Sequence, residues 1–164
     1  MVHVRIASLS VDSVSNQPVI ILRPVDESHA EGRLVPIWIG QAEATAILLA
    51  LQGIAPPRPM THDLLASVIG QMGATLSRVE ITRIEGGTFY ANLIVADEGG
   101  AEREIDARPS DSIALAVRTG SPIYLSEQVL EEAAVIEVTE EDEEDEVERF
   151  RAFLDHVDPS DFQS

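Results

Sequence analysis

Two short segments hold the residues of this chain that are best suited to chemistry. The first is Pro-Met-Thr-His-Asp-Leu at 59–64, and the second is Ile-Asp-Ala-Arg-Pro-Ser-Asp-Ser at 105–112. Both are expected where a loop turns into a helix, so unpaired backbone N–H groups should point outward beside them. Groups that ionise and groups that bind phosphate therefore meet in each segment, which is typical of a functional site.

The first segment offers an acid or base next to a phosphate-binding group. His62 can accept or donate a proton near neutral pH, and Arg58 just before the segment can bind a phosphate. Asp63 is a candidate metal ligand or base. A structural explanation is also available, because His62 can pack on Pro57 or Pro59 and the helix dipole favours a carboxylate in the first turn. The spacing alone leaves both interpretations open.

The second segment places two carboxylates around an arginine. If a strand ends and a helix begins here, Asp106 and Asp111 can face one crevice. Arg108 and Ser110 would then hold a phosphate, and Pro109 would set the angle at which the chain enters the helix. The structural alternative is that Asp106 is a solvated strand end, Asp111 answers the helix dipole, and Arg108 pairs with one of them.

A third carboxylate, Glu43, follows Gly40 at the start of another expected helix, and we expect Trp38 just before it to pack in the core. If the three helix starts converge, their oxygen ligands can bind Mg²⁺ or Mn²⁺. The candidate metal ligands are Asp63, Asp106 and Asp111. No organic cofactor is expected, since the chain has no Walker A loop and no GxGxxG motif.

The composition limits what such a site can bind. The chain has a formal net charge of −18 and all 11 basic residues are arginine. Non-specific nucleic-acid binding depends on cations that neutralise phosphates, so phosphate recognition here has to be local. The chain has no cysteine, which excludes disulfides and thiolate metal sites. No apolar run approaches the ~20 residues of a membrane span, and the first residues resemble a strand more than a signal peptide; we expect a cytoplasmic protein with no membrane partner.

Hydrophobic periodicity and turn residues predict an α+β fold with a mixed, largely antiparallel sheet packed with three to four helices. The expected strands are Val2–Val14, Val19–Val25, Leu34–Ile39, Ala74–Glu85, Thr88–Ala96, Ala101–Ala107 and Pro122–Leu125. The expected helices are Ala42–Leu51, one capped by Thr61 and ended by Gly73, Ser110–Thr119 and Glu127–Ala134. Asp26–Arg33 is expected to be a loop.

The chain changes character after a first domain of residues 1–136. In the tail, 137–164, the acidic run Glu140–Glu146 is expected to be a disordered linker. Phe150, Phe153, Leu154 and Val157 then recur at helical spacing. This short amphipathic helix can pack on its own domain or on a dimer mate, or it can dock on a protein partner.

Several segments resemble the bifunctional nuclease family of bacteria and plants, in order over residues 2–135. The matching segments are Leu34–Gly40 with Glu43 and Ala44, Arg58–Leu64, Gly87–Ala91 and Asp106–Ala116. The resemblance implies an α+β domain that is often dimeric. It also implies nuclease activity towards RNA and DNA, as attributed to plant members.

Two functions follow. The first is a metal-assisted phosphodiesterase acting on RNA or DNA. Its candidate ligands or bases are Glu43, Asp63, Asp106 and Asp111, with His62 as acid or base and Arg58 and Arg108 holding phosphate. The second is a non-catalytic dimeric module that binds a small anionic ligand or a protein. The resemblance favours the first function, and the acidic composition favours the second.

Overall fold

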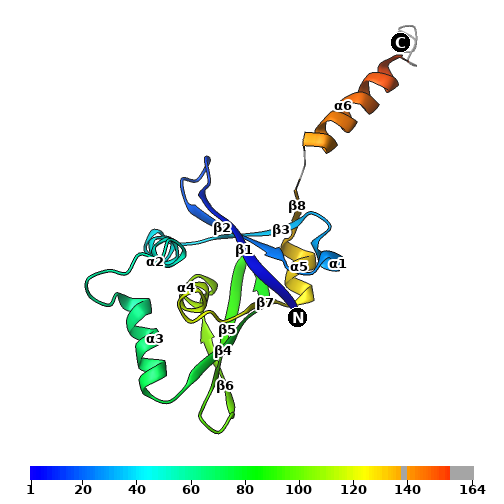
Figure 1. The fold of residues 1–164 in the computed structure, drawn as a ribbon. Helices are drawn as coiled ribbons and strands as arrows, with labels where there is room; N and C mark the ends of the chain where they lie inside the picture. Colours follow the sequence, from blue (N-terminus) through cyan, green and yellow to red (C-terminus); the bar gives the residue numbers. More distant parts are fainter. Residues whose placement is uncertain (138–139, 156–164) are drawn as a thin grey trace.

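One eight-stranded sheet forms the framework of the fold (Figure 1). The computed structural model describes residues 1–137 and 140–155. The strands lie in the order β6-β5-β4-β7-β1-β2-β3-β8, and every neighbouring pair is antiparallel except β4 with β7. The strands are β1 (Val2–Val11), β2 (Pro18–Pro24), β3 (Arg33–Trp38), β4 (Thr75–Glu85), β5 (Thr88–Ala96), β6 (Glu102–Ala107), β7 (Ile123–Leu125) and β8 (Val135–Ile136). The expected α+β class with a mixed, largely antiparallel sheet is confirmed.

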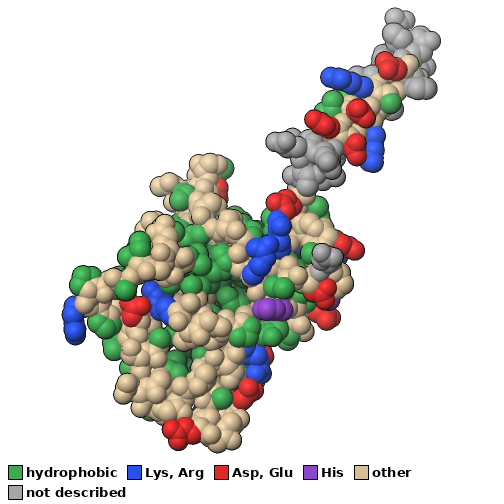
Figure 2. All heavy atoms as spheres, viewed as in Figure 1, with side chains coloured by type: hydrophobic (Ala, Val, Ile, Leu, Met, Phe, Trp, Pro, Cys, Tyr) green, Lys and Arg blue, Asp and Glu red, His purple; other side chains and the backbone are tan. Residues whose placement is uncertain are grey.

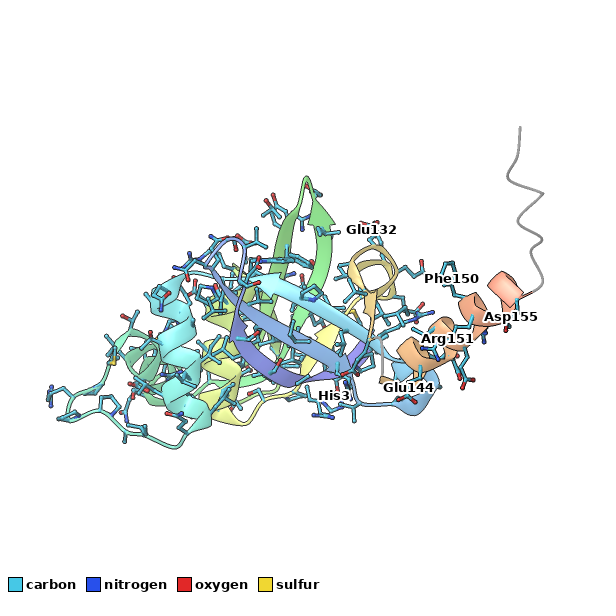
Figure 3. The ribbon with its side chains drawn as sticks, turned by 90° about the horizontal axis from the view of Figure 1, so that it is seen from above. His3, Glu132, Glu144, Phe150, Arg151 and Asp155 are labelled. Atoms are coloured by element: carbon cyan, nitrogen blue, oxygen red, sulfur yellow. The ribbon has the colours of Figure 1, made fainter. Side chains whose placement is uncertain are left out.

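One face of the sheet carries the hydrophobic core, because side chains alternate along each strand. Val4 of β1 pairs with Ile123 of β7, and both are buried. Their neighbours His3 and Tyr124 lie on the opposite face, with ring centroids 5.2 Å apart. Figure 3 shows His3 and Glu132, which belongs to the helix that follows β7, on opposite sides of the domain. The helical residues Ile47, Leu115 and Leu130 belong to the same buried cluster as Val4 and Ile123, so the helices cover the core face, and His3 marks the open face.

Helix α4 is the centre of the helical layer. The helices are α1 (Glu27–Ala30), α2 (Gln41–Leu51), α3 (Thr61–Gln71), α4 (Pro109–Thr119), α5 (Glu127–Ala133) and α6 (Glu140–Asp155). Helix α4 packs on β4 and β5 and also contacts α2 and α3, and seven of its 11 residues are buried. Because α4 contacts both other helices, its first turn can meet the starts of α2 and α3.

Helix α3 leaves most of its apolar residues uncovered. None of its residues is fully buried, although its spacing predicts an apolar face. Within that face only Ile69 packs partly against the core. Leu64, Leu65 and Val68 of α3 and its C-cap Met72 are exposed, and we call these four the α3 apolar surface.

Two local expectations were wrong, and in each case a short contact to a carboxylate fixes the start of a helix. The loop after β2 contains the single turn α1, since Asp26 Oδ1 accepts the backbone N–H of Ser28 at 3.0 Å. The N-cap of α3 is Met60 rather than Thr61. The Met60 N–H donates to Asp63 Oδ2 at 2.9 Å, which draws the chain into the helix one residue early.

The acidic run was also mispredicted, because Glu140–Glu146 begins α6 instead of forming a disordered linker. Glutamate is a good helix former, and carboxylates in a first turn interact favourably with the helix N-terminus. Figures 1 and 3 show α6 standing away from the sheet, with Phe150 exposed. Val157, part of the expected amphipathic face, lies outside the described residues. None of the helices in the described part of the chain has the length and apolar character needed to cross a membrane.

A candidate active site at three helix starts

The starts of α2, α3 and α4 meet through one continuous set of side-chain contacts. Arg108, the N-cap of α4, donates from Nη2 to Glu43 Oε1 of α2 at 2.7 Å and from Nε to Asp111 Oδ2 at 2.8 Å. The other oxygen of Asp111 lies 2.9 Å from Nε2 of His62 in α3. Four of the expected site residues, from three segments of the chain, therefore form one cluster, which we call the helix-start cluster.

Asp111 orients the imidazole of His62. The side chain of His62 is only 12% exposed and that of Asp111 is 31% exposed. A carboxylate that accepts from one ring nitrogen selects the tautomer and stabilises the imidazolium when the ring takes up a proton. The pair is thus suited to general acid–base chemistry.

Arg108 is held by carboxylates but remains open to solvent. Its side chain is 67% exposed, and the ion pairs with Asp111 and then Glu43 raise the pKa of its guanidinium. Gly40, the N-cap of α2, leaves the space that the Glu43 carboxylate occupies. Arg108 therefore presents a fixed cation that can receive a phosphate on its open side.

Asp63 has a structural role beside His62. Its Oδ1 accepts from Nε of Arg118 at 2.7 Å, and the same arginine donates to Ala46 O at 3.0 Å and to Ala114 O at 2.7 Å. The hydrogen bond from Arg118, followed by that from the Met60 N–H, lowers the pKa of Asp63. These contacts fasten the first turn of α3 to α2 and α4.

Arg118 is the residue that sequence reasoning missed. It lies in the last turn of α4, where the helix dipole favours any basic residue, so its position carries no specific signal. Its side chain is 10% exposed, and a nearly buried arginine needs a carboxylate partner. That burial, rather than any spacing in the sequence, identifies it.

Asp106 is not brought into the cluster. It pairs with Asn92 in the register of β5 and β6, whereas its neighbour Ala107 pairs with Ala91 of the core face. Directly paired residues share a face and consecutive residues alternate, so Asp106 points to the open face with Glu104. The backbone of Asp106 pairs with β5, but within the described residues its side chain makes no hydrogen bond or ion pair.

The two remaining phosphate-binding candidates lie in different settings. Arg58 is exposed in the proline-rich loop before α3, and in the described part of the chain it has no ion pair. Ser110 is buried in the first turn of α4 and lines a cleft beside Arg108. It does not cap the helix, since Arg108 is the N-cap and Ser112 Oγ donates to its carbonyl.

The cleft beside the helix-start cluster has an aromatic wall. Its volume is about 340 Å³, and its lining includes Trp38, Phe89, Arg108 and Ser110. Trp38 was expected in the core but is 50% exposed. It alternates with buried Ile37 in β3, so its ring points away from the core. Figure 2 draws one face of the molecule, where hydrophobic side chains lie next to charged ones.

The described residues do not fit a preassembled metal site. Among them, no three His, Asp or Glu side chains lie close enough together to hold an ion. Glu43 and Asp111 are engaged by Arg108, and Asp63 by Arg118. The expected ligand set also fails to assemble, because Asp106 lies on the open face of the sheet.

Comparisons with known proteins agree with the resemblance seen in the sequence. The model of a family described as the bifunctional nuclease domain matches residues 20–138. An uncharacterised protein of Mycobacterium tuberculosis (strain H37Rv) is 46% identical over 171 aligned positions, covering 100% of this chain and 99% of that protein. Bifunctional nuclease 1 of Oryza sativa subsp. japonica is 30% identical over 112 positions, which cover 67% of this chain and 33% of the plant protein. Bifunctional nuclease 1 of Arabidopsis thaliana is 27% identical over 111 positions, with 66% and 33% covered. The chain belongs to the bifunctional nuclease domain family.

Proposed function

We propose that this protein cleaves phosphodiester bonds of RNA or DNA at the helix-start cluster. The observation that carries the proposal is the continuous contact from His62 through Asp111 and Arg108 to Glu43. It combines an oriented imidazole with an exposed guanidinium, the two groups that phosphodiester cleavage needs most. The names of the plant relatives support the reaction class.

In this proposal His62 takes the proton from an attacking water, or from the neighbouring 2′-hydroxyl of RNA, as that oxygen bonds to phosphorus. The bond from phosphorus to the leaving sugar oxygen then breaks, and that oxygen takes a proton from solvent. Asp111 holds the imidazole and stabilises the positive charge that it acquires. Arg108 binds the non-bridging oxygens of the phosphate and balances the charge that grows on them. Glu43 keeps the guanidinium in place at the start of α2. No step of this mechanism uses the expected Mg²⁺ or Mn²⁺. Its candidate ligands Asp63 and Asp111 are paired with arginines, and Asp106 lies on another face.

The test is degradation of labelled single-stranded RNA and DNA by highly purified protein. We expect cleavage by the wild type and its loss in His62→Ala. His3→Ala is the matched control, because His3 lies on the open face of the sheet. Asp106→Ala controls for loss of a carboxylate outside the cluster. Parallel reactions with Mg²⁺, Mn²⁺ and chelator establish whether a metal is needed, and equal cleavage in every variant would contradict the assignment.

A non-catalytic binding module is the second candidate, and the charge of the chain favours it. A net charge of −18 repels a polyanionic substrate over most of the surface. Under this function Arg108 binds a small anion and no bond is cleaved. Wild-type protein that binds but never cleaves oligonucleotides would support the module over the nuclease.

We also propose that two copies of the chain associate through the α3 apolar surface. Leu64, Leu65, Val68 and Met72 are exposed together along one helix, and a contiguous apolar patch of this kind marks an interaction site. Asp63, in the first turn, is the only acidic residue of α3. Two copies can therefore meet there without the repulsion that their net charge imposes elsewhere.

A further inference from the structure

Trp38 stands beside the proposed catalytic cluster but has no part in its contacts. Half of its surface is exposed, and it lines the same cleft as Arg108 and Phe89. We propose that Trp38 stacks on a base of single-stranded nucleic acid while Arg108 binds the adjoining phosphate. This inference rests on the proposed function, since it names the substrate class of the same site.

The indole ring is held in place before any ligand arrives. Its Nε1–H donates to Asp12 Oδ2 at 3.0 Å. Asp12 is itself fixed in the turn after β1, because it accepts from the Val14 N–H at 3.0 Å and from Ser15 Oγ at 2.8 Å. Because the ring is fixed at its polar edge and half exposed, it loses little freedom when a ligand binds, which favours affinity.

The form of the cleft favours one strand over two. Its volume of about 340 Å³ lies at the lower end of the range of about 300–1,000 Å³ for small-molecule sites. Bases of a duplex are paired and stacked on each other, so they cannot enter such a cleft, whereas single-stranded bases can be splayed onto aromatic side chains. Phe89 adds a second aromatic side chain to the lining of the cleft.

The net charge of the chain indicates which interaction has to supply the affinity for nucleic acid. With a net charge of −18, binding cannot depend on a broad basic surface, and stacking has to supply most of the affinity. Binding should therefore weaken only slightly with salt. The logarithm of the association constant should fall with the logarithm of the salt concentration with a slope of about −0.7, as expected for one phosphate contact on a single strand.

The chain supplies its own probe, because Trp38 is its only tryptophan. The full chain carrying His62→Ala, which prevents the proposed cleavage, is titrated with a six-nucleotide single-stranded RNA and its indole emission is followed. We expect saturable quenching. An abasic strand with the same number of phosphates, and a duplex of the same sequence, should each quench at least tenfold less well. Equal quenching by the abasic strand, or no quenching at all, would overturn the proposal.

Substitutions separate stacking from folding. Affinity for a dye-labelled strand should fall about fivefold or more in Trp38→Ala and be largely retained in Trp38→Phe, because each stacked base contributes strongly to affinity. Phe150→Ala is the matched control, since Phe150 is an exposed aromatic residue on α6. Equal affinity in Trp38→Ala and Trp38→Phe would contradict the stacking role. So would indole emission that changes only with protein concentration, because that would assign Trp38 to contact with a second copy.

The outcomes distinguish this inference from the function on which it rests. Cleavage without quenching would leave the nuclease proposal standing and remove the stacking subsite. Quenching by single strands without any cleavage would keep the subsite and identify the protein as a binding module.

Discussion

The imidazole Nε2 of His62 lies 2.9 Å from Asp111 Oδ1, although 49 positions separate the two residues in the chain. The contact joins the first turn of α3 to the first turn of α4. It is the most direct evidence that two motifs, each ambiguous alone, belong to one site.

Asp111→Asn should reduce turnover much more than it reduces stability. Loss of the carboxylate leaves His62 without the partner that orients it, and general acid–base catalysis contributes about 10²–10⁴-fold to rate. We expect a fall of about two orders of magnitude or more in kcat, measured with the labelled single strand. Asp106→Asn should leave kcat unchanged, and an equal fall in both variants would count against the site.

Arg118→Met should destabilise the domain. The substitution leaves Asp63 without its partner and removes two hydrogen bonds to backbone carbonyls. Hydrogen bonds that involve a charged group contribute about 1.5–3 kcal/mol each, but Asp63 is partly solvated. We therefore expect the free energy of unfolding to fall by roughly 2–3 kcal/mol in urea titrations. Arg103→Met, at an exposed arginine of β6, is the matched control and should change it by less than about 0.5 kcal/mol.

The stability that Asp63 contributes should disappear in acid. In the folded protein Arg118 and the Met60 N–H lower the pKa of Asp63 from the ordinary aspartate value of 3.8. A carboxylate with a lowered folded pKa stabilises the fold above its unfolded pKa, and this contribution is lost as the pH falls through the folded pKa. The difference in unfolding free energy between wild type and Asp63→Asn should thus be constant at neutral pH and shrink below about pH 4. A difference that stays constant down to pH 3 would be inconsistent with this ion pair.

Val68→Glu should change the association of the chain without unfolding it. Val68 lies in the α3 apolar surface, and a charge there on each copy would repel the other. We expect the wild type to be a dimer by light scattering and Val68→Glu a monomer with unchanged circular dichroism. Val14→Glu, at an exposed valine in the turn after β1, should remain dimeric. A wild type that is monomeric at high concentration would refute the proposed interface.

Local patterns in the sequence were sufficient for most of the secondary structure. The alternation of β1 and the glycine turns on both sides of β5 predict strands correctly, because each depends on residues a few positions apart. The starts of α2, α3 and α4 were also found to within a residue, since helix ends depend on local residue types. Glu140–Glu146 was misjudged because its high charge outweighed its helix propensity in that interpretation.

The sequence by itself determined which residues can do chemistry here, and the tertiary structure decided which of them act together. Asp106 and Asp111 are five positions apart, yet strand register turns one to the open face and the helix turns the other towards His62. The partner of Asp63 is Arg118, which only the packing of α3 on α4 could bring near. Alternation in β3 exposes Trp38, but its place beside Arg108 depends on how β3 and α4 are stacked. Such long-range neighbours follow from the packing of whole elements, which no local spacing encodes.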